Sequence, residues 1–287
     1  MSQNPLVITQ EEFESFLTIL KNRTGIVPRA SHRDGIKAYI EKKMAEKKLS
    51  VITFKNELLA NEGLFTELVN ESTVNETYFF REERQFALLR DKIFPSWKKD
   101  FAPARIKIWS AACSYGEEAY SLALLAKAAG LNASVLASDI NSIVLNHCKK
   151  GIFSGSSIRP VDGLAFQDLL LPYRKDDMSI EFDEQIKACI KTQKINLSTM
   201  DLPETSLFLP KNQNIIFLRN VFIYFNPDLR AKILHTIAEK CLADGGLLFV
   251  SMSEIAQLGR ELVPPSLEKV VDGSVFYFRK KGEKSNV

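Results

Sequence analysis

The chain has 287 residues, of which 45% are hydrophobic and 25% charged, and its net charge is +3. This composition is typical of a globular protein with enough apolar material for a core. The small net charge gives no global signal for binding to nucleic acid, so any electrostatic recognition must be local.

Cysteine usage and hydropathy narrow the class of protein further. The four cysteines form no CxxC pair and the three histidines are isolated, which argues against a zinc site and a disulfide framework. No apolar run is long enough to span a bilayer, and residues 1–8 lack the basic start and apolar stretch of a signal peptide. We therefore expect a cytoplasmic, metal-free protein with reduced cysteines and no membrane insertion.

Residues 1–74 predict a small all-helical domain, because they contain no strand pattern. Apolar residues recur at helical spacing, and Thr9 with Glu12 fits a capping box at the first helix. The expected helices cover residues 9–20, 31–48, 51–61 and 64–69. The second helix is basic, since the stretch from Arg29 to Lys48 contains seven Lys and Arg but only three acidic residues.

From residue 105 onward, strands alternate with helices. The expected strands cover residues 106–111, 134–137, 214–218, 247–251 and 275–279, and the expected helices cover residues 117–129, 142–149 and 228–242. This order predicts a doubly wound α/β fold with a parallel sheet, whose ligand lies at the carboxyl ends of the strands. We assign residues 75–104 to an interdomain linker and helix, and residues 105–287 to the α/β domain.

Two segments depart from the alternation. Residues 179–197 show apolar and polar residues in turn without a helix, which predicts a small antiparallel β insertion within the α/β domain. The tail, residues 280–287, is expected to be disordered.

The first expected ligand loop, residues 111–118, contains only one glycine, so it matches neither the GxGxxG dinucleotide pattern nor the P-loop. A positively charged sulfonium nucleoside has no phosphate and would be favoured by Glu117 and Glu118, although these residues could simply complement a helix start. Asp139, at the end of the second strand, could accept both hydroxyls of a ribose or cap the next helix. Loop and acid together favour an adenosine ligand.

Four segments resemble one family, the chemotaxis receptor methyltransferases of the CheR type. They are residues 75–81 (NETYFFR), 108–118 (IWSAACSYGEE), 137–140 (ASDI) and 217–225 (FLRNVFIYF). Residues 244–249 and 253–254 fit as well, so the resemblance covers most of the chain in the right order. Tyr115 and Ala119 depart from the Thr and Pro that the family usually has, which could reshape the loop around the cofactor.

The resemblance implies a small all-helical N-terminal domain followed by a doubly wound methyltransferase domain with a small β-subdomain. It also implies S-adenosylmethionine (SAM) as cofactor and S-adenosylhomocysteine (SAH) as product. The residues that it assigns to the cofactor are Asn75, Thr77, Arg81, Glu117, Asp139, Asn196, Leu197, Arg219 and Asn220. Of these, Asp139 would meet the ribose, Asn196 and Leu197 the adenine, and Arg219 with Asn220 the methyl donor.

Arg81 and Tyr224 are the candidate catalytic residues. Arg81 could hold a carboxylate through two parallel hydrogen bonds, either that of the cofactor or that of the substrate. A surface ion pair is the plain alternative for Arg81, and a core tyrosine is the alternative for Tyr224.

The implied reaction moves a methyl group to glutamate side chains on the cytoplasmic helices of chemotaxis receptors. A carboxylate is ionised at neutral pH, since its reference pKa is about 4.3, so no general base is needed.

In some family members the β-subdomain docks a receptor tail peptide, but the weak match of this segment does not extend that docking to this chain. The basic stripe of Arg33, Lys37, Lys47 and Lys48 is either a solvated face or a contact for an acidic receptor helix.

Two other functions stay open. A nucleic-acid methyltransferase would need a basic groove, and often has an N/D-P-P-Y/F tetrapeptide that residues 219–222 (RNVF) do not match. A signalling module could bind SAM or SAH without turnover, because binding and catalysis would use the same residues.

Overall fold

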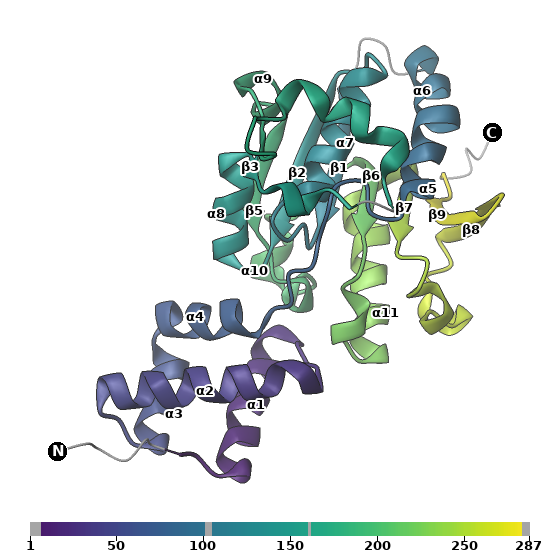
Figure 1. The fold of residues 1–287 in the computed structure, drawn as a ribbon. Helices are drawn as coiled ribbons and strands as arrows, with labels where there is room; N and C mark the ends of the chain where they lie inside the picture. Colours follow the sequence, from purple (N-terminus) through teal and green to yellow (C-terminus); the bar gives the residue numbers. More distant parts are fainter. Residues whose placement is uncertain (1–6, 101–104, 160–161, 283–287) are drawn as a thin grey trace.

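The computed structural model describes residues 7–100, 105–159 and 162–282, and Figure 1 shows its two parts. The helices of the first part are α1 (Gln10–Thr24), α2 (Ala30–Lys47), α3 (Val51–Ala60) and α4 (Glu62–Ser72). The capping box of Thr9 and Glu12 is present, and Asn61 separates α3 from α4 because its side chain caps the start of α4. Phe16, Ile40 and Phe54 are fully buried between these helices.

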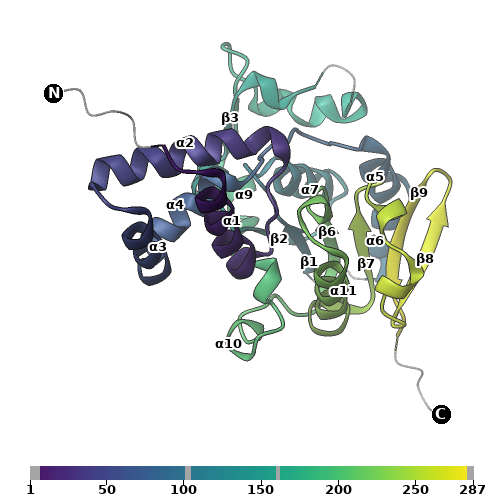
Figure 2. The ribbon, with the colours of Figure 1, turned by 90° about the horizontal axis from the view of Figure 1, so that it is seen from below.

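A single large sheet organises the second part. Its strands are β1 (Ile106–Ala111), β2 (Ala133–Asp139), β5 (Ile190–Lys194), β6 (Gln213–Leu218), β7 (Leu242–Val250), β8 (Leu267–Asp272) and β9 (Val275–Lys280). The described strands lie in the order β5-β2-β1-β6-β7-β9-β8, and the first five are parallel. β9 is antiparallel to both β7 and β8. The β8–β9 hairpin and the N-terminal helices lie at opposite ends of the molecule (Figure 2).

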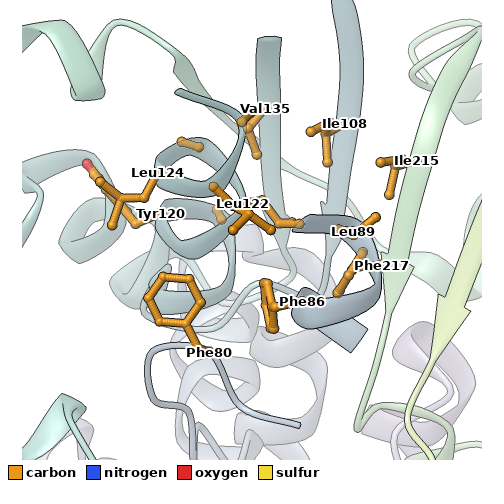
Figure 3. Close-up of a cluster of buried hydrophobic side chains, with 14 of the residues drawn as sticks. Phe80, Phe86, Leu89, Ile108, Tyr120, Leu122, Leu124, Val135, Ile215 and Phe217 are labelled. Atoms are coloured by element: carbon orange, nitrogen blue, oxygen red, sulfur yellow. The ribbon is translucent and has the colours of Figure 1, made fainter. Parts of the chain in front are cut away.

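Helices cover the sheet on both faces. The longer ones are α5 (Glu83–Leu88), α6 (Phe94–Asp100), α7 (Glu117–Ala128), α8 (Ser142–Lys150) and α11 (Pro227–Thr236), and the shorter ones are α9 (Glu184–Lys187) and α10 (Pro203–Ser206). On one face, Phe86 of α5 and Leu122 of α7 pack against Phe217 of β6 (Figure 3). On the other face, Trp109 and Ile216 pack with the apolar side of α11. The expected mixed α/β fold is confirmed.

The structure corrects the interpretation of residues 179–197. Only β4 (Ile180–Glu181) forms a small antiparallel sheet, and its partner is β3 (Ile152–Phe153). Residues 190–194 instead pair in parallel with β2 as an edge strand of the large sheet. This edge strand is only partly covered, with exposed residues at Lys191 and Lys194, so its sequence mixes apolar and polar residues as that of a separate hairpin does.

Three elements in the C-terminal part of the chain also differ from expectation. The helix expected over residues 228–242 is α-helical only to Thr236 and continues as a π-helix to Cys241. β8 was not expected, because its charged residues hide the strand pattern. β9 extends to Lys280, so the expected disorder is wrong there, and residues 283–287 lie outside the described residues. Within the described ranges, no helix is long and apolar enough to cross a membrane.

Candidate active site

A pocket that is partly open to solvent lies between the helical part and the carboxyl ends of the parallel strands. The loop after β1 contributes Ala112, Cys113 and Ser114, and the end of β2 contributes Asp139 and Ile140. The remaining walls come from residues 72–78 with Arg81, from residues 195–197 after β5, from residues 219–221 with Tyr224 after β6, and from Thr24 and Ile26. The linker and both parts of the molecule therefore share one pocket.

Most of the site residues expected from the sequence line this pocket. They are Asn75, Thr77, Arg81, Asp139, Asn196, Leu197, Arg219, Asn220 and Tyr224. Glu117 is not among the lining residues, and its carboxylate accepts a hydrogen bond from the Ser157 hydroxyl at 2.8 Å. The neighbouring Glu118 lines the pocket instead. Glu117 as a cofactor contact stays a prediction.

The loop after β1 holds an unusual backbone conformation. Ala112 and Ser114 have φ values of 63° and 53°, and Gly116 has a φ of 109°. A Cβ on Gly116 would lie 2.5 Å from the Cys148 sulfur, so a side chain there would displace α8. The single glycine of the loop therefore lets it pack closely against α8, and strain of this kind is common at ligand sites.

Asp139 lines the pocket and does not cap α8. Its two oxygens accept backbone hydrogen bonds from Ser114 and Asn141, both at 2.9 Å. Asn141 is the residue that caps α8, which excludes the cap role considered for Asp139. Each Asp139 oxygen keeps a further lone pair for a ligand hydroxyl. Burial raises the pKa of Asp139, while the backbone hydrogen bonds oppose that shift.

The linker is strained on both sides of Arg81. Phe80 and Glu82 have φ values of 56° and 59°, although neither is glycine. The Phe80 amide donates to the Ser121 hydroxyl, and the Glu82 amide donates to Asp162, both at 3.0 Å. Such a conformation persists only where the surrounding structure holds it. The result is that Arg81 is presented to the pocket from a fixed backbone.

Arg219 and Glu118 form a buried ion pair beneath this turn. Their Nε and Oε2 atoms are 3.4 Å apart, and the side chains are 2% and 14% exposed. Burial raises the pKa of Glu118, and the charge of Arg219 opposes that rise. The Nη1 atom of Arg219 has no hydrogen-bond partner among the described residues. An unsatisfied, buried donor beside a pocket favours a ligand that can accept from it.

Glu254 supports the opposite wall. Its carboxylate accepts from the backbone amides of Asn220, at 2.8 Å, and Ile223, at 3.4 Å. These bonds hold Asn220 at a φ of 56° and fix the backbone of the segment that leads to Tyr224. Burial raises the pKa of Tyr224, so its hydroxyl stays protonated and can donate a hydrogen bond. Sequence reasoning noted Glu254 only as part of the family resemblance, because its partners lie 31 or more positions away in the chain.

The chemistry of the lining limits what can react here. Among the described residues that line the pocket there is no histidine or lysine. Cys113 is buried, and its neighbour Cys148 together with this burial holds the pKa of its thiol well above the usual value. A thiol in that state is a poor nucleophile. The described residues also contain no group of His, Cys, Asp and Glu that could hold a metal ion.

Comparisons with known proteins identify the family of the chain. Residues 75–263 match the family described as CheR methyltransferase, SAM binding domain. Chemotaxis protein methyltransferase 1 of Vibrio cholerae is 32% identical over 268 residues, which are 87% of this chain and 90% of that protein. The chemotaxis protein methyltransferases of Vibrio anguillarum and Vibrio parahaemolyticus are 31% and 30% identical, again over 87% of this chain and 90% of each relative.

The residues of the pocket fit SAM. Asp139 has lone pairs free to accept hydroxyl groups, Nη1 of Arg219 has no hydrogen-bond partner among the described residues, and the carboxylates of Asp139 and Glu118 suit a ligand that carries a positive charge. The cofactor is SAM, as the matched family description states. The chain belongs to the CheR family of SAM-dependent methyltransferases, whose matched relatives are chemotaxis protein methyltransferases.

Proposed function

We propose that this protein methylates glutamate side chains on the cytoplasmic helices of chemotaxis-type receptors, in the cytoplasm, and forms methyl esters and SAH. One observation carries the proposal. Arg81 and Tyr224 line the same pocket as Asp139, and no described lining residue is a histidine or lysine. The lining carboxylates of Glu76, Glu118 and Asp139 are already engaged, with Arg159, with Arg219 and with backbone amides respectively. Such a pocket suits an acceptor that is already ionised and needs no general base. A glutamate carboxylate is an acceptor of this kind.

In this proposal each wall of the pocket has its own task. Asp139 accepts from the ribose hydroxyls, Asn196 and Leu197 lie beside the adenine, and Asn75 with Thr77 closes the site from the linker. Thr77 acts on the carboxyl group of Glu117, so Glu117, although outside the lining, would help to position Thr77. Arg219 and Asn220 lie beside the methyl donor. When bound, SAM supplies a methyl group on a positively charged sulfur.

The candidate catalytic residues then align the acceptor. Arg81 donates from Nη1 to the carbonyl of Glu76 at 2.8 Å, which leaves its other N–H groups for a carboxylate. Tyr224 donates a hydrogen bond that orients the incoming oxygen. Catalysis arises from alignment and from removal of water around the carboxylate, rather than from proton transfer.

The basic stripe of α2 gives this proposal little support. Arg33 pairs with Glu14, Lys37 lies 3.9 Å from Glu41, and Lys47 lies 2.7 Å from Glu57. Such partners neutralise most of the stripe before any receptor arrives. Docking of an acidic receptor helix on the stripe stays a prediction, and so does docking of a tail peptide on the small β3–β4 sheet.

The test is incubation with SAM that carries a tritiated methyl group, together with cytoplasmic receptor fragments. Base-labile label in the fragment, lost when its acceptor glutamates are changed to glutamine, is the expected result. Base-stable label in added nucleic acid would instead identify a nucleic-acid methyltransferase. Absence of label despite measurable SAH binding would identify a binding module without turnover.

A further inference from the structure

The connection between α1 and α2 is fixed against the pocket. The Val27 amide donates to the carbonyl oxygen of Tyr224 at 3.1 Å, and the Asn196 side chain donates to the carbonyl oxygen of Arg23 at 2.8 Å. Gly25, with a φ of 71°, lies so close to Leu229 that a Cβ would collide with it. These contacts hold Thr24 and Ile26, the two residues of this connection that line the pocket, against its wall.

Arg29, two residues after Val27, lies beside Tyr224, which lines the pocket, although Arg29 itself is not a lining residue. Its guanidinium carbon lies 5.7 Å from the centre of the Tyr224 ring, and the side chain is exposed. Among the described residues, Arg29 has no ion pair and its side chain makes no hydrogen bond, whereas Arg33, Lys43 and Lys47 of α2 all have acidic partners. The charge of Arg29 acts on Tyr224 together with that of Arg81, and both oppose the rise in the Tyr224 pKa that burial causes.

Arg29 also occupies a position that helix physics does not favour. It is the N-cap residue of α2, and its side chain makes no capping hydrogen bond. Ser, Thr, Asp and Asn are preferred at this position, and a cation is unfavourable beside the positive end of a helix dipole. Natural sequences break such local rules mainly where function requires it.

We propose that Arg29 binds the acceptor carboxylate of the protein substrate as it approaches the pocket next to Tyr224. This inference rests on the proposed function and names a further substrate-binding residue for it. One hydrogen bond from Arg29 to a carboxylate oxygen leaves the second oxygen free to accept the methyl group. The ester product carries no charge, so the attraction to Arg29 is lost on methylation and the product is released.

The experiment measures how well the protein distinguishes a carboxylate from its neutral equivalent. A receptor fragment with glutamate at its methylation positions and a twin with glutamine there are each titrated by calorimetry into protein saturated with SAH. Wild-type protein is expected to prefer the glutamate fragment about tenfold or more. Arg29→Ala should lower this preference at least fivefold by weakening only the glutamate fragment, in line with the loss of one charge-assisted hydrogen bond.

Lys42→Ala is the matched control, because it removes one positive charge from an exposed position on the same helix. Lys42 lies 13 positions after Arg29, which is about 20 Å along a helix. It should leave the glutamate preference within twofold of wild type. Equal loss of preference in both variants, or none in Arg29→Ala, would overturn the inference while wild-type methylation still supports the proposed function. Wild-type protein that esterifies no glutamate in the fragment would overturn the proposed function itself.

A second variant separates recognition from folding. Arg29→Ser places a good N-cap residue at the start of α2, so its melting temperature should equal or exceed that of wild type. Its methylation of the glutamate fragment should nevertheless show a KM raised at least fivefold, with unchanged affinity for SAH. A purely structural Arg29 would give the reverse pattern, a lower melting temperature with an unchanged KM.

Discussion

The guanidinium of Arg219 donates a hydrogen bond to the carbonyl oxygen of Arg81 at 2.6 Å. This bond joins the end of β6 to the strained turn of the linker, so two segments separated by 138 positions in the chain form one wall of the pocket. Arg219 also pairs with Glu118 at the start of α7. The Arg81 backbone and the Glu118 carboxylate are therefore held by the same buried cation.

Replacement of this cation should destabilise the protein strongly. Arg219→Met leaves the Glu118 carboxylate buried without its partner, which costs about 3–5 kcal/mol. The double variant Arg219→Met with Glu118→Gln should recover much of that loss, because it removes the buried charge. Urea denaturation of the two variants and wild type measures this.

The stability lost in Arg219→Met should depend on pH, and the direction of that dependence follows from the pKa of Glu118. Burial raises the pKa of Glu118, and loss of Arg219 removes the charge that opposes the rise. A carboxyl group with a raised folded-state pKa favours the folded state below its unfolded pKa, and this stability is lost as pH rises through the folded pKa. The deficit of Arg219→Met should thus be larger at pH 8 than at pH 5. Equal deficits at both pH values would mean that Glu118 is not the buried charge responsible.

Arg81 should matter to the cofactor, to the substrate, or to both. Loss of a hydrogen bond to a charged partner costs about 1.5–3 kcal/mol, so Arg81→Ala should weaken either SAH affinity or substrate affinity by roughly tenfold or more. Calorimetry with SAH, followed by methylation kinetics, shows which carboxylate Arg81 holds. Arg90→Ala is the control, because Arg90 is an exposed arginine paired with Asp91. Wild-type values for both ligands in Arg81→Ala would refute a role in the site.

The affinity for SAH should fall as the pH is lowered. The ionised Asp139 carboxylate can accept from two ribose hydroxyls, and protonation replaces one acceptor by a donor. Because burial raises the pKa of Asp139, this loss should begin at a higher pH than for an exposed aspartate. Calorimetry between pH 7 and pH 5 is expected to show weaker binding at the acidic end. A flat profile in that interval would contradict ribose binding by ionised Asp139.

The close packing of residues 23–27, which holds Thr24 and Ile26 against the pocket, can be tested at Gly25. Gly25→Ala forces an alanine into a φ of 71° and a collision with Leu229. Gly245→Ala imposes the same φ of 71°, but no atom lies within 4 Å of its new Cβ. The left-handed conformation alone costs about 1–2 kcal/mol, so both variants should lose that much. Only Gly25→Ala should lose more and also methylate receptor fragments more slowly, as thermal melts and kinetics would show.

Sequence patterns predicted the residues that line the pocket better than the residues that hold those in place. Asp139 and Arg219 follow buried strands, and parallel strands end at one edge of a sheet, so their meeting could be expected. The roles of Asp162 and Ser121 in holding the linker could not, because neither hydrogen bond follows any periodicity. The alternation in residues 190–194 was compatible with two sheets, and only the pairing with β2 decides between them. From the sequence, Arg29 was only one of seven basic residues between Arg29 and Lys48. Its place beside Tyr224 depends on how the helical part packs against the α/β part, which no local pattern predicts.

The most direct test of the central claim is a crystal structure of the protein with SAH bound. We expect the ribose hydroxyls on the Asp139 carboxylate, the adenine beside Asn196 and Leu197, and the sulfur facing the space between Arg81 and Tyr224. A ribose that lies away from Asp139, or a sulfur that no acceptor could reach past Tyr224, would contradict it.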